Sequence, residues 1–321
     1  MIRYIIRRVI WVLLVMLIIT VLTYLIFFVM PPTDPAVAFA GKAATPQMIA
    51  EVRHLFGLDK PLWEQYLLFV KHLFLGDRWG WPGLGFSFTT RSSVRSIIAS
   101  RIIVTTQLAV GAALIWLAIG IPIGVLSALR PRTLTDRVAM GFALFGVSAP
   151  VFWLGLMALW LFWFKLGIAA GSGYVSIGTS FFGWLNHMLM PWFVLAFLFA
   201  AFYARITRAG LIETMNEDFV RTARAKGVPE WKVVLKHGLR ASLTPVVTML
   251  GMDLGTLLGG AIITETVFNL QGIGLYAVQS VYNGDLPAIL AVTVIASLAI
   301  SVMNLIVDIV YAFLDPRIRY T

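Results

Sequence analysis

The sequence predicts an all-α, polytopic membrane protein with about six transmembrane helices. Hydrophobic residues make up 60% of the 321 residues, and charged residues only 12%. A soluble chain of this length could not cover so much apolar surface, because a folded surface needs polar residues. Long apolar stretches recur along the chain, and Lys and Arg gather in alternate connections between them. Composition, apolar runs and charge asymmetry therefore indicate the same fold class.

Six stretches are candidate spans, because a spanning helix needs about 20 mostly apolar residues. The connections between them are polar or rich in Gly and Pro, which interrupt helices. The first span is longer than the apolar core of a secretory signal, which is about 7–15 residues, so we expect it to be retained. The six spans are Val9–Met30, Ile102–Leu129, Val138–Phe164, Met188–Ile206, Leu243–Phe268 and Leu286–Leu314.

The distribution of Lys and Arg predicts the orientation, because short cytoplasmic loops carry the excess of these residues. If the N-terminus is cytoplasmic, the cations of residues 3–8, 130–137, 205–240 and 317–319 all lie inside. The two short outer loops then hold only Lys165. Both termini are therefore expected in the cytoplasm. The net charge of +10 follows from the same asymmetry, so no nucleic-acid partner is expected.

The chain divides into an N-terminal transmembrane helix (1–30), an extracytoplasmic segment (31–101) and a five-helix core (102–321). The middle segment is a small helical insertion after the first helix. Thr45-Pro46 is a helix start, since Pro favours the first helical position. A second amphipathic stretch contains Tyr66, Leu67, Val70 and Phe74. These helices either lie on the membrane face or form a docking surface for a soluble partner.

The core contains a long basic loop, 207–243, that is predicted to be cytoplasmic. Phe219–Lys226 is predicted to be a helix with Asp218 as its cap, and Gly227 ends it by adopting the left-handed conformation. Pro229 then opens a second helix, with its apolar residues Trp231, Val234 and Leu235 on one side. A glycine-hinged helical pair of this kind either docks into another protein or rests on the bilayer surface.

This loop resembles the coupling loop of the membrane subunit of ABC importers of the dipeptide/oligopeptide/nickel class. The resemblance lies in Arg221–Gly227, followed by His237 and Pro245. It extends to Glu265-Thr266-Val267-Phe268 with Gly272-Ile273-Gly274, although Gln271 stands where the family usually has proline. Arg221-Thr222-Ala223, in place of the Glu-Ala-Ala of the general motif, favours the peptide class. The implied coupling residues are Ala223, Arg224, Ala225, Lys226, Gly227, Trp231, Leu235 and His237.

The resemblance implies the ABC importer permease fold in a prokaryotic cytoplasmic (inner) membrane. The chain would form half of a translocation pathway for peptides or a related solute. Its implied partners are a second homologous permease subunit, two ATP-binding subunits and an extracytoplasmic solute-binding protein, all assembled at the lipid bilayer. ATP and Mg would bind to the partner subunits, since no G-x-x-x-x-G-K-[ST] loop occurs in this chain.

No enzyme activity and no cofactor or metal site is expected in the chain itself. The four histidines are scattered without ligand spacing, and no catalytic constellation can be assembled. The alternative function is that of an ion-coupled secondary transporter, which needs intramembrane acids and usually has internal repeats. Asp253 and Glu265 are the candidate acids, and no clear repeat is visible. A membrane-embedded enzyme would need a catalytic cluster that the sequence lacks.

The fifth span carries the intramembrane residues of interest. Gly251, Gly255 and Gly259 recur every four residues, which lets another helix approach closely, and we expect them near the interface between two permease subunits. Asp253 faces away from them and either lines the pathway or bonds to a neighbouring helix. Glu265 is expected near the outer end of the same helix, as part of an outer gate or as a partly solvated acid.

Overall fold

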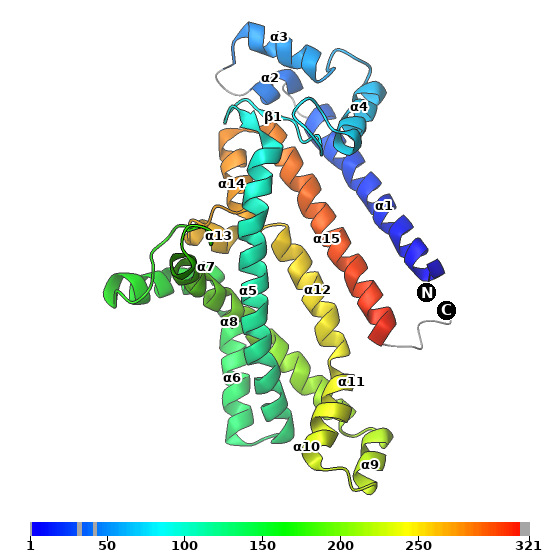
Figure 1. Cartoon of the computed structure of the whole chain (residues 1–321), viewed down its shortest axis with the longest axis vertical. Helices are drawn as coiled ribbons and strands as arrows, with labels where there is room; N and C mark the ends of the chain where they lie inside the picture. Colours follow the sequence, from blue (N-terminus) through cyan, green and yellow to red (C-terminus); the bar gives the residue numbers. More distant parts are fainter. Residues whose placement is uncertain (1, 31–33, 41–43, 315–321) are drawn as a thin grey trace.

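The computed structural model describes residues 2–30, 34–40 and 44–314. The all-α prediction is confirmed, with one exception among these residues: a two-stranded antiparallel sheet of β1 (Phe86–Ser87) and β2 (Ser92–Ser93). Residues 35–75, which form α2 (Pro35–Ala40), α3 (Pro46–Leu55) and α4 (Leu62–Leu75), lie at one end of the molecule (Figure 1). Helices α9 (Asp218–Ala225) and α10 (Glu230–Lys232) lie at the other end, with the long helices between them.

Four helical segments within the described residues are long and apolar enough to cross a membrane. They are α1 (Ile2–Tyr24) with its π-helical continuation η1 (Leu25–Val29), α5 (Val94–Leu129), α8 (Phe181–Thr214) and α15 (Leu286–Leu314). Two bent helix pairs raise this number to as many as six, if each pair is one span. The expected count of about six spans lies at the upper end of this range.

The third predicted span is broken, and its prediction as a single helix is wrong. It consists of α6 (Leu134–Ser148) and α7 (Val151–Ala158), which continues as the π-helical η2 (Leu159–Lys165). The two parts are bent by 100°. Pro150 accounts for the break, because proline drives the preceding residue away from helical geometry. Ala149 is accordingly extended, with φ −79° and ψ 125°.

The fifth predicted span is also interrupted. It begins as α12 (Thr244–Leu258), which is bent by 49° from the helical residues before it. The helix ends before Gly259 and Gly260, and Gly260 has a φ of 128° that favours glycine. The shorter helices α13 (Ile262–Val267) and α14 (Ile273–Asn283) follow. Glu265 therefore lies on a different helix from Asp253, contrary to expectation.

Two other spans are longer than their apolar runs predict. Helix α5 starts at Val94 rather than Ile102, and α8 extends beyond Met188–Ile206 at both ends. The polar first turns of α5 remain helical because Val94 and Ile98 are buried against Ile273 and Tyr276. Tertiary packing thus stabilises helix that the hydropathy pattern does not reveal.

The segment between α1 and α5 forms a cap, defined here as residues 34–40 and 44–93. It contains α2 (Pro35–Ala40), α3 (Pro46–Leu55), α4 (Leu62–Leu75) and the two strands. The predicted helix start is confirmed, since the Thr45 side chain accepts a hydrogen bond from the Met48 N–H at 3.3 Å. The cap is joined to α15, because Ser87 donates a hydrogen bond to Asp285 directly before that helix.

The main core lies between α5 and α8, around the buried Trp116 and Tyr203. Glycines let these helices approach closely: a Cβ atom on Gly120 would stand 2.9 Å from the Ala200 carbonyl oxygen. One on Gly124 would stand 2.6 Å from that of Ala204. Real Cβ atoms do not come this near, so glycine permits the approach.

Candidate coupling site and translocation path

A helical hairpin occupies the end of the molecule opposite the cap (Figure 1). Helix α8 leads into its first arm, α9 (Asp218–Ala225). The second arm comprises α10 (Glu230–Lys232), the π-helical η3 (Val233–Leu239) and α11 (Arg240–Ser242), and it leads into α12. The first arm begins one residue earlier than predicted, with Glu217 rather than Asp218 at the cap position.

Gly227 closes the hairpin through a Schellman motif. Its φ is 74°, the left-handed conformation predicted from the sequence. The Gly227 N–H donates to the Arg224 carbonyl at 2.9 Å, and the Val228 N–H donates to the Ala223 carbonyl at 3.2 Å. A Cβ atom on Gly227 would meet nothing within 4 Å. The demand for glycine here therefore comes from the backbone conformation and not from a lack of space.

The two arms share a small apolar core of Val220, Ala223 and Val233. Outside this core the second arm presents large apolar groups, with Trp231 63% and Leu235 52% exposed. The expectation that Val234 shares their side is wrong, since Val234 is only 5% exposed. The reason is that η3 is π-helical, so the usual 3.6-residue spacing does not apply along it.

An ion pair joins the arms at the surface. Arg224 donates to both carboxylate oxygens of Glu230, at 3.2 Å from Nε and 2.7 Å from a terminal nitrogen. This contact raises the pKa of Arg224 above its ordinary value. Ala225 and Lys226 are exposed beside it, and His237 is half-buried in the second arm. Of the sequence-predicted coupling residues, Ala223 is the one that lies in the hairpin core.

Gly251 and Gly255 of α12, and Gly259 directly after it, face α15 of the same chain. A Cβ atom on Gly251 would overlap the Val307 side chain. One on Gly255 would stand 3.1 Å from Met303 Cβ, and one on Gly259 would stand 3.2 Å from Ala296 Cβ. Small residues of this kind allow helices to pack closely in a membrane.

Asp253 contacts a neighbouring helix. The hydroxyl of Tyr203, on α8, donates to its carboxylate at 2.7 Å. Tyr203 is fully buried beside Trp116 of α5, so three helices meet around this acid. Asp253 itself is half-buried and is adjacent to the exposed Met252.

Glu265 is fully buried, which excludes a partly solvated acid. Its carboxylate accepts from the Thr105 hydroxyl at 2.8 Å and from the Leu275 N–H at 2.9 Å. The second contact satisfies the Leu275 N–H, which lies in the first turn of α14 where N–H groups have no partner within the helix. A Cβ atom on Gly272 would collide with this carboxylate, and one on Gly274 would stand 3.0 Å from it. The Gly-Ile-Gly sequence thus makes room for Glu265.

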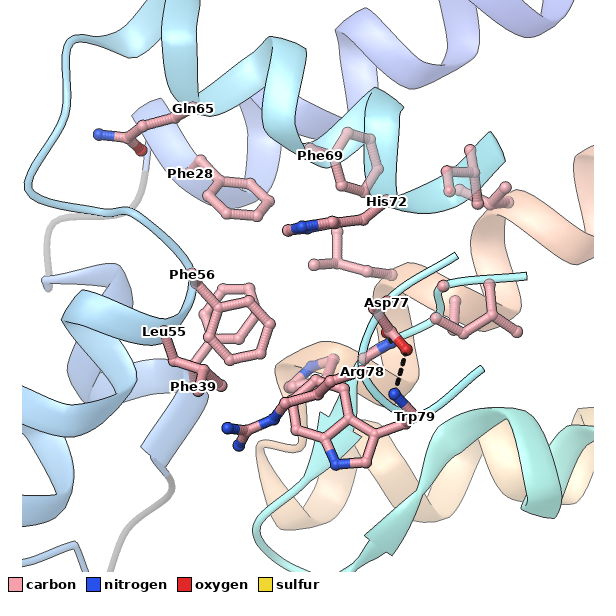
Figure 2. A pocket seen from close by; sticks show the side chains of 18 residues that line it. Phe28, Phe39, Leu55, Phe56, Gln65, Phe69, His72, Asp77, Arg78 and Trp79 are labelled. Carbon is pink, nitrogen blue, oxygen red and sulfur yellow. Dashed lines mark hydrogen bonds between the residues drawn. The ribbon is translucent and has the colours of Figure 1, made fainter. Parts of the chain in front are cut away.

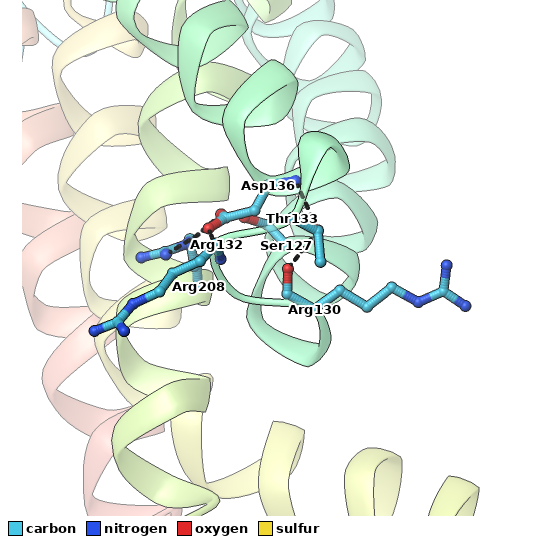
Figure 3. Close-up of polar contacts among 6 residues, drawn as sticks. All are labelled: Ser127, Arg130, Arg132, Thr133, Asp136 and Arg208. Atoms are coloured by element: carbon cyan, nitrogen blue, oxygen red, sulfur yellow. Dashed lines mark hydrogen bonds and ion pairs between the residues drawn. The ribbon is translucent and has the colours of Figure 1, made fainter.

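A further polar cluster, which the sequence analysis did not identify, joins α5, α6 and α8 (Figure 3). At its centre Asp136 accepts from Arg208 twice, with Nε–Oδ1 at 2.7 Å and a terminal nitrogen–Oδ2 at 2.9 Å. The Ser127 hydroxyl also donates to Oδ1, and the Arg132 N–H donates to Oδ2 at 2.8 Å. One local signal was present in the sequence: Thr133-x-x-Asp136 has the form of a helix-capping box.

A cavity of about 180 Å³ separates the cap from the beginning of α15. Its wall contains the rings of Phe28, Phe39, Phe56, Phe69 and His72, which surround a common hollow (Figure 2). Gln65 and Asp77 also line it, and both bind groups of the cap itself. Among the described residues, no group of three or more His, Asp or Glu side chains is arranged to hold a metal ion.

Comparison with known proteins places this architecture in a family. Residues 120–320 match the family described as "Binding-protein-dependent transport system inner membrane component". Residues 1–109 match the N-terminal family of the same transport systems. In the solved structures, an inward-facing MetNI methionine ABC transporter aligns with 69% of this chain and 97% of its own, at a TM-score of 0.55 and 19% identity.

Curated relatives cover the chain almost completely. The glutathione transport system permease protein GsiC of Escherichia coli (strain K12) is 39% identical over 321 residues and covers 100% of both chains. The probable D,D-dipeptide permease DdpB of the same strain is 38% identical over 89% of each chain. The dipeptide permease DppB is 35% identical over 92% of each. This likeness favours an ABC permease over an ion-coupled secondary transporter. The chain therefore belongs to the binding-protein-dependent permeases, the membrane subunits of ABC importers, and within them to the dipeptide/oligopeptide/nickel class.

Proposed function

We propose that this chain forms half of a pathway that imports short peptides across a prokaryotic cytoplasmic membrane. The support for peptides is that the three relatives are named for dipeptides, D,D-dipeptides and glutathione, itself a tripeptide. A second homologous permease subunit supplies the other half. An extracytoplasmic binding protein delivers the solute, and two separate subunits bind and hydrolyse ATP with Mg.

The orientation belongs to the same proposal. The hairpin and both termini face the cytoplasm, and the cap faces outward, because the short-loop Lys and Arg residues gather on the hairpin side. Reporter fusions after Arg132, Pro229 and Arg319 test this and are expected to report the cytoplasm. Fusions after Gly76 and Gly284 are expected to report the outside. The reverse result at Gly76 and Pro229 would contradict the orientation.

The hairpin is the part of the chain that docks into an ATP-hydrolysing subunit and receives its movement. The observation that carries this step is an exposed apolar surface, Trp231 and Leu235, on a helix pair closed by the Gly227 motif. Large exposed apolar groups at the tip of a small helical unit fit a protein groove. The surrounding Arg and Lys residues complement an acidic groove. Such contacts drive reorientation when the partner binds the two states with different free energies.

Replacing Gly227 tests the coupling role. Gly227→Val forces a β-branched residue into the left-handed region, at a cost of about 1–2 kcal/mol. Gly227→Asn is the matched control, because Asn tolerates this conformation. Both side chains have open space at Cβ, so the two variants differ in how readily Val and Asn adopt the left-handed backbone conformation.

The assay is ATP hydrolysis and peptide uptake by the whole complex in proteoliposomes, with and without loaded binding protein. The expected result is that Gly227→Val loses stimulation and uptake while Gly227→Asn retains both. Normal stimulation in Gly227→Val would contradict the coupling role and favour a hairpin that rests on the bilayer.

Asp253, the three glycines and Glu265 have separate roles within the membrane in this proposal. Asp253 borders the pathway, supported by its half-buried carboxylate next to the exposed Met252. An acid there suits the cationic amino terminus of a peptide. Gly251, Gly255 and Gly259 allow α15 to pack closely, and Glu265 stabilises the start of α14; the complete burial of Glu265 favours that structural role over a gate.

A further inference from the structure

One carboxylate, that of Asp136, connects three helices on the hairpin side of the core. Its two oxygens accept four hydrogen bonds: two from Arg208 of α8, one from Ser127 of α5 and one from the backbone of the α5–α6 turn. Its side chain is only 6% exposed. A two-bond guanidinium–carboxylate contact fixes orientation as well as distance. The start of α6 is therefore held to α8 in a defined geometry.

The partner of this carboxylate stands next to the hairpin. Arg208 lies two turns before the end of α8, which leads directly into α9. The second hairpin arm packs on the turns that follow Arg208. A Cβ atom on Gly238 would stand 3.0 Å from Leu211 Cδ1 and 2.7 Å from Met215 Sδ, and one on Gly210 would stand 3.3 Å from the Ser242 carbonyl. Glycines at these contacts bring hairpin and α8 together closely, so a shift of the hairpin must shift this part of α8.

A buried ion pair is poor evidence for stability alone, because desolvating two charges offsets much of their attraction. The arrangement at Asp136 is instead directional and complete, since each oxygen has two donors. Arg132, one of the donors, has a φ of 66°, so the α5–α6 turn takes an unfavourable backbone conformation that this carboxylate holds. The cluster thus fixes the position of that turn relative to α8.

We propose that Asp136 is a positioning residue in coupling: through Arg208 it makes the α5–α6 turn follow α8 when the hairpin moves. This inference rests on the proposed coupling role of the hairpin. It describes how movement of the hairpin is transmitted through α8 to α5 and α6, which pack beside α8.

The first test replaces Arg208 with Lys in the complete complex in proteoliposomes. Lysine keeps the charge but loses the planar two-bond contact. The measurement is the number of ATP molecules hydrolysed per peptide imported. The expected result is a rise of at least about threefold, the size of effect seen when a residue of a coupling network is changed. The matched control is Arg130→Lys: Arg130 lies in the same turn, but its side chain points away from the cluster (Figure 3). An unchanged ratio in an assembled Arg208→Lys complex would overturn the proposal.

Combination with the hairpin variant separates this inference from the proposed function. If Gly227→Val alone leaves stimulation normal, the hairpin role fails. If Gly227→Val uncouples but Arg208→Lys does not, only the role of Asp136 fails. When both act on one path, Arg208→Lys adds little to the loss caused by Gly227→Val. If the losses caused by the two variants add fully in the double variant, the ion pair contributes to stability and not to coupling, and the proposal is overturned.

A second measurement does not depend on any variant of the ion pair. The chain contains no cysteine, so spin labels can be placed at Leu134→Cys on α6 and Ala209→Cys on α8. Both positions are exposed. The distance between the labels is expected to stay constant through the nucleotide cycle while the hairpin moves. A change between the nucleotide-free and ATP-bound states would show that α6 does not follow α8, and would overturn the proposal.

Discussion

The contact between α12 and α15 provides the sharpest stability test. In Gly251→Ala, the new Cβ atom would overlap one Val307 methyl group, while its other neighbours within 4 Å are Val307 Cβ at 3.2 Å and the Met303 carbonyl at 3.8 Å. Overpacking of this kind typically costs about 1–3 kcal/mol. Alanine is also the better helix former, which returns about 0.5–1 kcal/mol. We therefore expect a net loss of up to about 2.5 kcal/mol in the free energy of unfolding.

Val307→Ala should relieve this overlap, because it deletes the methyl group that the new Cβ meets. Alone, Val307→Ala leaves a small void and loses contacts worth on the order of 1 kcal/mol. In the double variant the new Cβ atom at position 251 fills the void that Val307→Ala leaves. The combined loss should fall below the sum of the single losses by on the order of 1 kcal/mol, the usual size for residues in direct contact.

The assay is reversible unfolding of the purified chain in mixed micelles, with all four members of the cycle. Gly255→Ala is the control partner, since its Cβ would face Met303 Cβ and the Ile300 backbone instead of Val307. Val307→Ala should not rescue it. Strict additivity of Gly251→Ala and Val307→Ala would refute this packing of α12 on α15.

Three further predictions concern other contacts. In Glu265→Gln an amide NH2 replaces one of the two oxygens that accept from Thr105 and Leu275, so the change should destabilise the chain by about 1–3 kcal/mol, whereas Gln271→Glu at an exposed position should have little effect; equal losses in thermal unfolding would contradict this. Arg132→Gly should be neutral or stabilising by up to about 1 kcal/mol, because glycine accepts a φ of 66°; a clear loss of melting temperature would contradict it. Burial raises the pKa of Asp285. Its ionised form is therefore disfavoured in the fold, and stability should decline as the pH rises from roughly 4 through the raised pKa, a decline that Asp285→Asn should lack; parallel melting curves across this pH range would contradict the assignment.

Local chemistry explains which features could be predicted from the sequence. The Gly227 turn depends only on nearby residues, because a glycine in the left-handed conformation follows the end of a helix directly. The start of α3 likewise depends on the adjacent Thr45 and Pro46. Hydropathy located the spans but not their breaks, because the apolar residues continue through Pro150 and through Gly259-Gly260. These breakers were visible in the sequence. The direction in which the chain continues after them is set by packing.

Long-range contacts account for what the sequence could not predict. Asp136 and Arg208 are 72 positions apart, and Glu265 and Thr105 are 160 apart. No periodicity relates such pairs, so an isolated acid in an apolar run can only be marked as unusual. The prediction that Val234 lies beside Trp231 and Leu235 was wrong for another reason. The sequence pattern assumes α-helical spacing, and the π-helical turn of η3 rotates the residue inward.

The pairing of α1 with α15 has a consequence for biosynthesis. Helix α1 packs along α15, and Arg8 forms an ion pair with Asp308 at 2.9 Å. The ribosome makes α15 only after the other described helices. Helix α1 must therefore remain near the insertion site, or return to its partner, while all the intervening helices enter the bilayer. A chain truncated before α15 would lose the surface on which both α1 and the glycine face of α12 pack, so degradation of incomplete chains should begin from these two helices.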